Sequence, residues 1–134
     1  MPAPKLFLIT AALMTLACQS APPHPVKAST VLWRPIAQWT GHGNQQTDSF
    51  EMGNAEWRIK WETSQEAPPG KGTFKVTVHS AISGRPLISA VDFQGVGKDT
   101  TYVTEDPRLF YLVIDSANVQ WAVTVETSVV TDAK

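Results

Sequence analysis

The strict alternation of apolar and charged residues over 56–62, EWRIKWE, constrains this chain more than any other feature. Trp57, Ile59 and Trp61 occupy every second position, and charged side chains separate them. In a β-strand successive side chains point to opposite faces, whereas a helix spreads them around its circumference. The segment is therefore predicted to be a strand with one buried face and one solvated face.

Comparable segments recur along the chain at spacings of about 8–12 residues. No window outside the N-terminal apolar run shows a sustained helical period. Seven or eight such strands predict an all-β fold, an antiparallel two-sheet β-sandwich of jelly-roll type. The segments are 36–39, 47–52, 56–62, 74–79, 87–93, 100–104, 109–114 and 121–126.

The first twenty residues, MPAPKLFLITAALMTLACQS, have the pattern of a secretory signal. Lys5 is followed by an apolar run over 6–17 that ends in small residues. This run is shorter than the roughly 18–20 residues that a helix needs to cross a bilayer, so a membrane-spanning helix is the weaker interpretation. We predict that 1–17 is a signal peptide and that the rest of the chain is exported.

The single cysteine lies where the apolar run ends. Thr15-Leu16-Ala17-Cys18 resembles the lipobox of bacterial lipoprotein precursors, with Thr15 at the position where leucine is usual. The resemblance implies that the thiolate of Cys18 takes an acyl-glycerol group, that Cys18 becomes the mature N-terminus, and that the lipid anchors the mature chain in a membrane. The alternative is a signal cleaved after Ala17 or Ala21, with Cys18 unmodified.

The same resemblance implies a location at the cell envelope. Gln19 follows the cysteine, where aspartate would retain a lipoprotein in the inner membrane, so the outer membrane is expected in a Gram-negative cell. Residues 18–31 carry the cysteine and a proline-rich segment that is predicted to be a flexible tether. The β-sandwich is predicted to span 32–130.

The mature domain also resembles small exported β-sandwich domains that share a W-x-I-x-W strand, an F-x-V-x-V strand and a closing aromatic strand. The corresponding segments here are 57–61, 74–78 and 110–114. This resemblance implies no activity.

Two of the five tryptophans are candidates for a ligand-binding surface. Trp57, Trp61 and Trp121 alternate with polar residues and are assigned to the core, where large aromatic side chains dominate packing. Trp33 and Trp39 lie in less regular sequence. Packing is the favoured interpretation for them too, and an exposed patch that stacks on sugar rings is the alternative.

No group of residues has the pattern of a catalytic or metal site. The three histidines lack the spacing of a zinc site, and no serine nucleophile accompanies them with an orienting acid. The loop carboxylates are interpreted as solvated turn residues rather than calcium ligands. We therefore expect no enzyme activity, no metal and no cofactor. These groups are His24, His42 and His79, and Asp92, Asp99, Glu105 and Asp106.

The formal net charge of −1 leaves no basic stripe for a phosphate backbone, so nucleic acid is not expected as a partner. The first functional hypothesis is a membrane-anchored, non-catalytic binding or structural module that meets an envelope protein or polysaccharide. The second is a carbohydrate-binding domain that uses Trp33, Trp39 and Tyr102. A small hydrolase or inhibitor is the third, without named residues.

Overall fold

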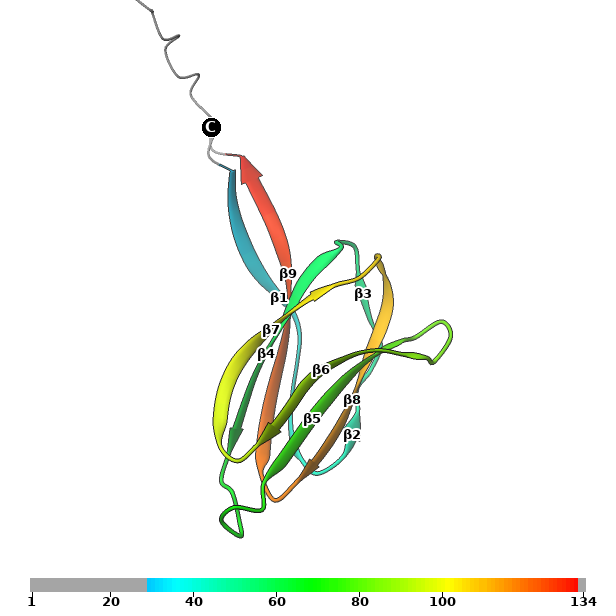
Figure 1. The fold of residues 1–134 in the computed structure, drawn as a ribbon. Helices are drawn as coiled ribbons and strands as arrows, with labels where there is room; N and C mark the ends of the chain where they lie inside the picture. The colour runs from blue at the N-terminus through cyan, green and yellow to red at the C-terminus, as the bar shows by residue number, and fades with distance from the viewer. Residues whose placement is uncertain (1–28, 133–134) are drawn as a thin grey trace, which may run out of the picture.

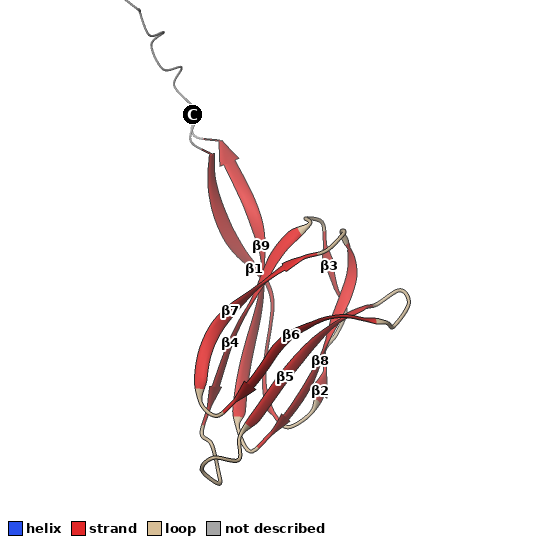
Figure 2. Cartoon of the chain, in the orientation of Figure 1, coloured by secondary structure: helices blue, strands red, loops and turns tan. Residues whose placement is uncertain are grey.

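The computed structural model describes residues 29–132, and the regular secondary structure of this range is entirely β (Figure 2). Cys18 and the predicted signal peptide lie outside the described residues. The strands are β1 (Ser29–His42), β2 (Gln45–Gln46), β3 (Phe50–Met52), β4 (Glu56–Ser64), β5 (Thr73–Ser80), β6 (Pro86–Gln94), β7 (Gly97–Thr104), β8 (Arg108–Ala117) and β9 (Gln120–Asp132).

Residues 29–132 contain no helix with the length and hydropathy needed to span a bilayer.

The strands form two antiparallel sheets that pack against each other (Figure 1). Sheet A has the order β1-β9-β4-β7, and sheet B has the order β2-β8-β5-β6, with β3 also paired to β8. Apart from β2–β3 and β5–β6, consecutive strands lie in opposite sheets. This order is that of a jelly roll, so the all-β, two-sheet prediction is confirmed.

The number of strands was predicted wrongly, because the described range contains nine rather than seven or eight. Of the expected strand over 47–52 only Phe50–Met52 forms a strand, and a further short strand, Gln45–Gln46, precedes it. Both pair with β8, and the pairing is interrupted from Thr47 on. Thr47 donates its N–H to the Leu112 carbonyl at 2.9 Å, but the Leu112 N–H donates to the Thr47 hydroxyl at 2.9 Å. A side-chain oxygen thus replaces the backbone carbonyl, and the ladder breaks at this residue.

The core lies between the two sheets and contains the inward side chains that the alternation predicted. Trp57, Ile59 and Trp61 of β4 are buried, as is Trp121 of β9, which confirms their assignment to the core. Two aromatic groups fill much of the space. One comprises Trp39, Phe50, Trp57 and Phe110, and the other comprises Trp61, Phe74, Phe93 and Trp121.

Threonine hydroxyls of sheet A bind backbone groups around the β6–β7 turn. The Thr63 hydroxyl donates to the Gly95 carbonyl in this turn at 2.8 Å and accepts from the Gly97 N–H of β7 at 3.0 Å. The Thr101 hydroxyl donates to the Ala90 carbonyl at 3.0 Å. The Thr101 bond therefore joins β7 of sheet A to β6 of sheet B, and the Thr63 bonds hold the turn on β4.

The predicted domain boundaries at 32 and 130 differ from the structure. Strand β1 begins at Ser29 and β9 ends at Asp132, so the last residues of the predicted tether are part of a strand. Beyond the last β4 pairing at Thr127, β1 and β9 continue alone as a two-stranded ribbon (Figure 1). Pairing between the start of β1 and the end of β9 extends sheet A past the core, and composition alone does not reveal this pairing.

The interruption at Thr47 has a measurable energetic consequence. Thr47→Ala removes the acceptor of the Leu112 N–H in a buried position, and we expect it to lower the free energy of unfolding by about 1–3 kcal/mol. Thr47→Ser keeps the hydroxyl and should retain most of the stability. Urea denaturation of both variants measures the difference, and equal losses would contradict the assigned role of the hydroxyl.

The indole ring of Trp61 packs between Phe74 and Phe93, with centroid distances of 5.6 Å and 4.9 Å. Trp61→Ala should therefore cost about 3–5 kcal/mol of unfolding free energy in thermal or urea denaturation. Val130→Ala, in the ribbon, should cost less than about 0.5 kcal/mol because that side chain is exposed. A loss below about 1 kcal/mol for Trp61→Ala would show that the ring is not part of the core.

Candidate functional site: the outer face of sheet A

A β-bulge separates the two candidate tryptophans of β1. The register of β1 on β9 shifts between Pro35 and Ala37. Trp33 and Trp39 are six residues apart and would share a face in a regular strand. The extra residue in the bulge places them on opposite faces of sheet A.

Trp39 lies on the inner side of sheet A. It is half-buried, packs against the core and approaches Phe50 with a ring-centroid distance of 5.9 Å. It is opposite the buried residue Val123 in the β1–β9 register. Trp39 therefore packs against the core, as the favoured interpretation expects, and does not lie on the outer face of sheet A.

Trp33 lies on the outer face of sheet A beside two side chains from neighbouring strands. The Arg58 guanidinium lies over the Trp33 ring, 4.4 Å from its centroid. The Tyr102 ring meets Trp33 edge-on, with a centroid distance of 5.7 Å. The tyrosine is 65% exposed, so one aromatic ring of this pair is open to solvent.

Arg58 of β4 is held in place by a charged partner on the neighbouring strand β9. Its Nε donates to Glu126 Oε1 at 2.6 Å, and the two side chains are only 19% and 9% exposed. Arg58 stands directly opposite Glu126 on β9 and Tyr102 on β7 in the strand register. The ion pair therefore fixes the cation on which Trp33 packs, and a charge-assisted bond of this kind is stronger than a neutral one.

The cluster of Trp33, Arg58, Tyr102 and Glu126, here called the aromatic cluster, lies at one end of a groove. Two further rows of outward side chains continue along the sheet, at about 7 Å per pair of residues. The first row is Gln38, Thr124, Lys60 and Thr100, and the second is Thr40, Ala122, Glu62 and Lys98.

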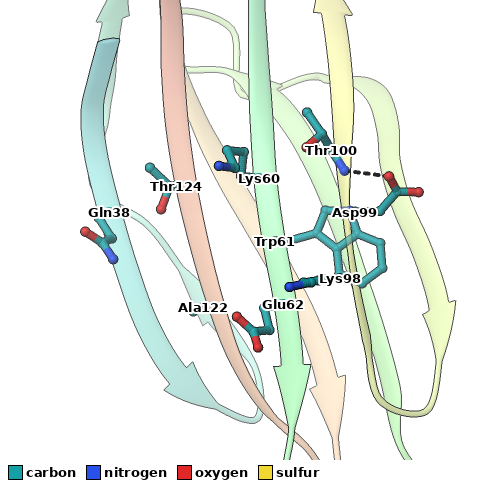
Figure 3. A pocket seen from close by; sticks show the side chains of 9 residues that line it. All are labelled: Gln38, Lys60, Trp61, Glu62, Lys98, Asp99, Thr100, Ala122 and Thr124. Atoms are coloured by element: carbon teal, nitrogen blue, oxygen red, sulfur yellow. Dashed lines mark hydrogen bonds between the residues drawn. The ribbon is translucent and has the colours of Figure 1, made fainter. Parts of the chain in front are cut away.

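The groove forms because β9, an inner strand of sheet A, carries short side chains at its outward positions. Ala122 and Thr124 of β9 lie between Gln38 on β1 and the long side chains of Lys60 and Glu62 on β4 (Figure 3). The depression has a volume of about 510 Å³. A second depression of about 460 Å³ shares the Glu62 and Ala122 walls and continues toward the β1–β2 turn. The surface is therefore elongated along β9 rather than a single round pocket.

Charges of both signs line this groove, here called the β9 groove. Lys60 and Lys98 carry positive charge and Glu62 carries negative charge. The Asp99 side chain points away from the groove, because Asp99 is opposite the inward residue Trp61 in the β4–β7 register (Figure 3). Gln38, Thr100 and Thr124 add neutral hydrogen-bonding groups. The lining thus offers both donors and acceptors, and its charges are of mixed sign.

The other candidate residues of the sequence are not brought together. Asp99 and Glu105 lie at opposite ends of β7, and the Asp92 carboxylate is 4.0 Å from Lys75 on sheet B. His79 stacks on Tyr111 at 5.0 Å, also on sheet B. Among the described residues, no three histidine, cysteine, aspartate or glutamate side chains are grouped so that they could hold a metal ion.

The sequence pattern did not predict most of this surface, although it contained one indication of the groove. The charged positions of β4 were identified only as the solvated face of a strand. The small residues that alternate with Trp121, Val123 and Val125 were not recognised as the floor of a groove. The short side chains of Ala122 and Thr124 indicate a groove only when β9 is known to lie between β1 and β4, whose outward side chains are longer.

The Arg58–Glu126 pair can be tested by a double-mutant cycle of Arg58→Met, Glu126→Leu and the double variant. Glu126→Leu leaves a largely buried guanidinium without its partner, and we expect a loss of about 2–3 kcal/mol in unfolding free energy. The double variant should lose less than the sum of the two single losses, since neither charge remains. If the single losses added up to the loss of the double variant in urea denaturation, the pair would not be coupled.

Comparison of the chain with family models, curated proteins and solved structures found no match.

Proposed function

We propose that this protein is an exported, lipid-anchored and non-catalytic binding module of the cell envelope, which binds its partner on the outer face of sheet A. Cys18 provides the anchor, and the β9 groove with the aromatic cluster provides the binding surface. The partner is a protein or polysaccharide of the envelope.

The observation that carries this proposal is the arrangement of the aromatic cluster. A solvated sheet face needs only polar side chains to remain soluble, yet here Trp33 and Tyr102 meet on it. The largely buried Arg58–Glu126 ion pair orients the tryptophan through the contact of the guanidinium with the indole ring. Aromatic side chains that are ordered and accessible next to a polar groove are typical of recognition surfaces.

The position of the ribbon supports a tethered arrangement. Ten residues, 19–28, separate Cys18 from the first residue of β1, a contour length of at most about 35 Å. The chain enters the sandwich through the ribbon, and the β9 groove runs along the strands away from that end. A membrane attached through Cys18 would therefore leave the outer face of sheet A accessible.

The anchor is tested by mass spectrometry of the protein purified from a bacterial cell that exports it. We expect an N-terminus at Cys18 that carries the mass of a diacylglycerol or triacyl group. Cys18→Ala should shift the protein from the membrane fraction to the soluble fraction. An unmodified cysteine, or a mature chain that begins at another residue, would contradict the anchor.

The binding face is tested with isolated cell envelopes and the soluble Cys18→Ala protein. Ala122→Arg places a long side chain on the groove floor and should reduce retention on the envelopes by at least about tenfold, or 1.4 kcal/mol. Ala117→Arg is the matched control, because Ala117 is exposed at the end of β8 in sheet B. Equal retention of the two variants would exclude the outer face of sheet A as the binding surface.

A further inference from the structure

We propose that the β9 groove binds a neutral oligosaccharide chain, one ring of which packs on Tyr102 while the following rings lie along β9. This inference rests on the proposed function, because it names the ligand class of the same surface. Four features of the described residues point to it: the exposed aromatic ring, the mixed charge, the elongated shape and the paired backbone of the floor.

The exposed aromatic ring provides an apolar platform. Tyr102 is 65% exposed, and Trp33 supports it edge-on from the neighbouring part of the sheet. The C–H bonds on one face of a pyranose ring pack against the negative face of an aromatic ring, while its hydroxyls remain free to hydrogen-bond. Because the ring is already held by its neighbours, little conformational freedom is lost when a ligand packs on it.

The mixed charge of the groove favours a neutral ligand. Lys60 and Lys98 lie beside Glu62 on the outer face, so the cations of the groove are not unopposed. A polyanion would require an excess of cations, and a polycation would require an excess of carboxylates. Sugar hydroxyls both donate and accept hydrogen bonds, and they are therefore suited to a lining that offers lysine, carboxylate, amide and hydroxyl groups side by side.

The elongated shape favours a chain over a small molecule. The two depressions share Glu62 and Ala122 and together follow β9 toward the turn that precedes β2. They begin at the row of Gln38 and Thr124, which is next to the aromatic cluster in the strand register. A single sugar would occupy only one end of this surface. Several linked sugars would use the aromatic platform and the polar rows together.

The paired backbone of the floor disfavours an extended peptide. Peptides that bind a sheet by strand addition use the free N–H and C=O groups of an edge strand. Strand β9 is hydrogen-bonded to β1 on one side and to β4 on the other along the whole groove. The floor of the groove therefore offers side chains and no free main chain, and recognition there depends on hydroxyls and rings rather than on β-pairing.

Arg58 is a positioning residue in this arrangement. Its guanidinium lies over the Trp33 ring, 4.4 Å from the centroid, and is held by Glu126, so it orients the aromatic pair without contributing an exposed charge. Arg58→Lys keeps the charge but lacks the planar group that stacks on the indole ring. We expect Arg58→Lys to weaken saccharide binding less than Tyr102→Ala does.

The test uses protein purified from a producing cell, in a detergent whose headgroup is not a sugar. The probes are cellohexaose, chitohexaose and mannohexaose as neutral chains, hexagalacturonate as an anionic chain, and an alternating Thr–Val hexapeptide as a strand-addition probe. Binding is followed by the NMR signal of the Trp33 indole N–H, which is assigned by its absence in Trp33→Phe. The control variant is Tyr111→Ala, an aromatic residue on the opposite face of the sandwich.

We expect at least one neutral hexasaccharide to shift the Trp33 signal with a dissociation constant of about 1 mM or below. Tyr102→Ala should weaken this binding by about tenfold or more, and Tyr111→Ala should leave it unchanged. Raising the salt from about 0.05 M to 0.5 M should change the affinity little, because the ligand carries no charge.

The inference is overturned if only hexagalacturonate or the hexapeptide binds, if none of the probes binds at about 10 mM, or if Tyr102→Ala binds as well as the unchanged protein. If Ala122→Arg still prevents envelope binding in those cases, the ligand class is wrong while the binding face stands. If Ala122→Arg has no effect on envelope binding, the proposed function itself fails.

Discussion

Strand β9 is the part of the molecule on which both the core and the candidate site depend. It is hydrogen-bonded to β1 and β4 over most of its length, and its two faces have different roles. The inward residues Trp121, Val123 and Val125 are buried against sheet B. The outward residues Ala122 and Thr124 form the floor of the β9 groove. Packing of the inner face therefore holds the groove floor rigid, and a rigid floor lowers the conformational cost of binding.

The second structural constraint is the bulge in β1. Pro35 cannot donate a backbone hydrogen bond, and such residues are tolerated at bulges and on edge strands. Strand β1 is an edge strand of sheet A, and its register shifts immediately after this proline. The bulge turns Trp33 to the outside while Trp39 stays against the core. One extra residue thus separates a packing tryptophan from one that faces solvent.

Much of the fold could be predicted because alternation is a local property of a strand. The pattern of Trp57, Ile59 and Trp61 specifies a buried face whichever strands lie beside it. The break at Thr47 could not be predicted in the same way. It depends on a hydrogen bond between the Thr47 hydroxyl and the N–H of Leu112, 65 residues away. The same limit applied to the ribbon, since the pairing of Ser29 with Asp132 joins the two ends of the described range.

The order of residues alone specified a β-sandwich, its main inward side chains, and the expectation of an export signal with Cys18 as the anchor. Those features depend on periodicity and composition within short stretches of chain. The candidate site was decided only by the tertiary structure. Trp33, Arg58, Tyr102 and Glu126 come from four strands that are far apart in the sequence, and no local pattern links them. Their contact depends on strand order, register and one bulge, which are set by how the two sheets bury their apolar faces against each other.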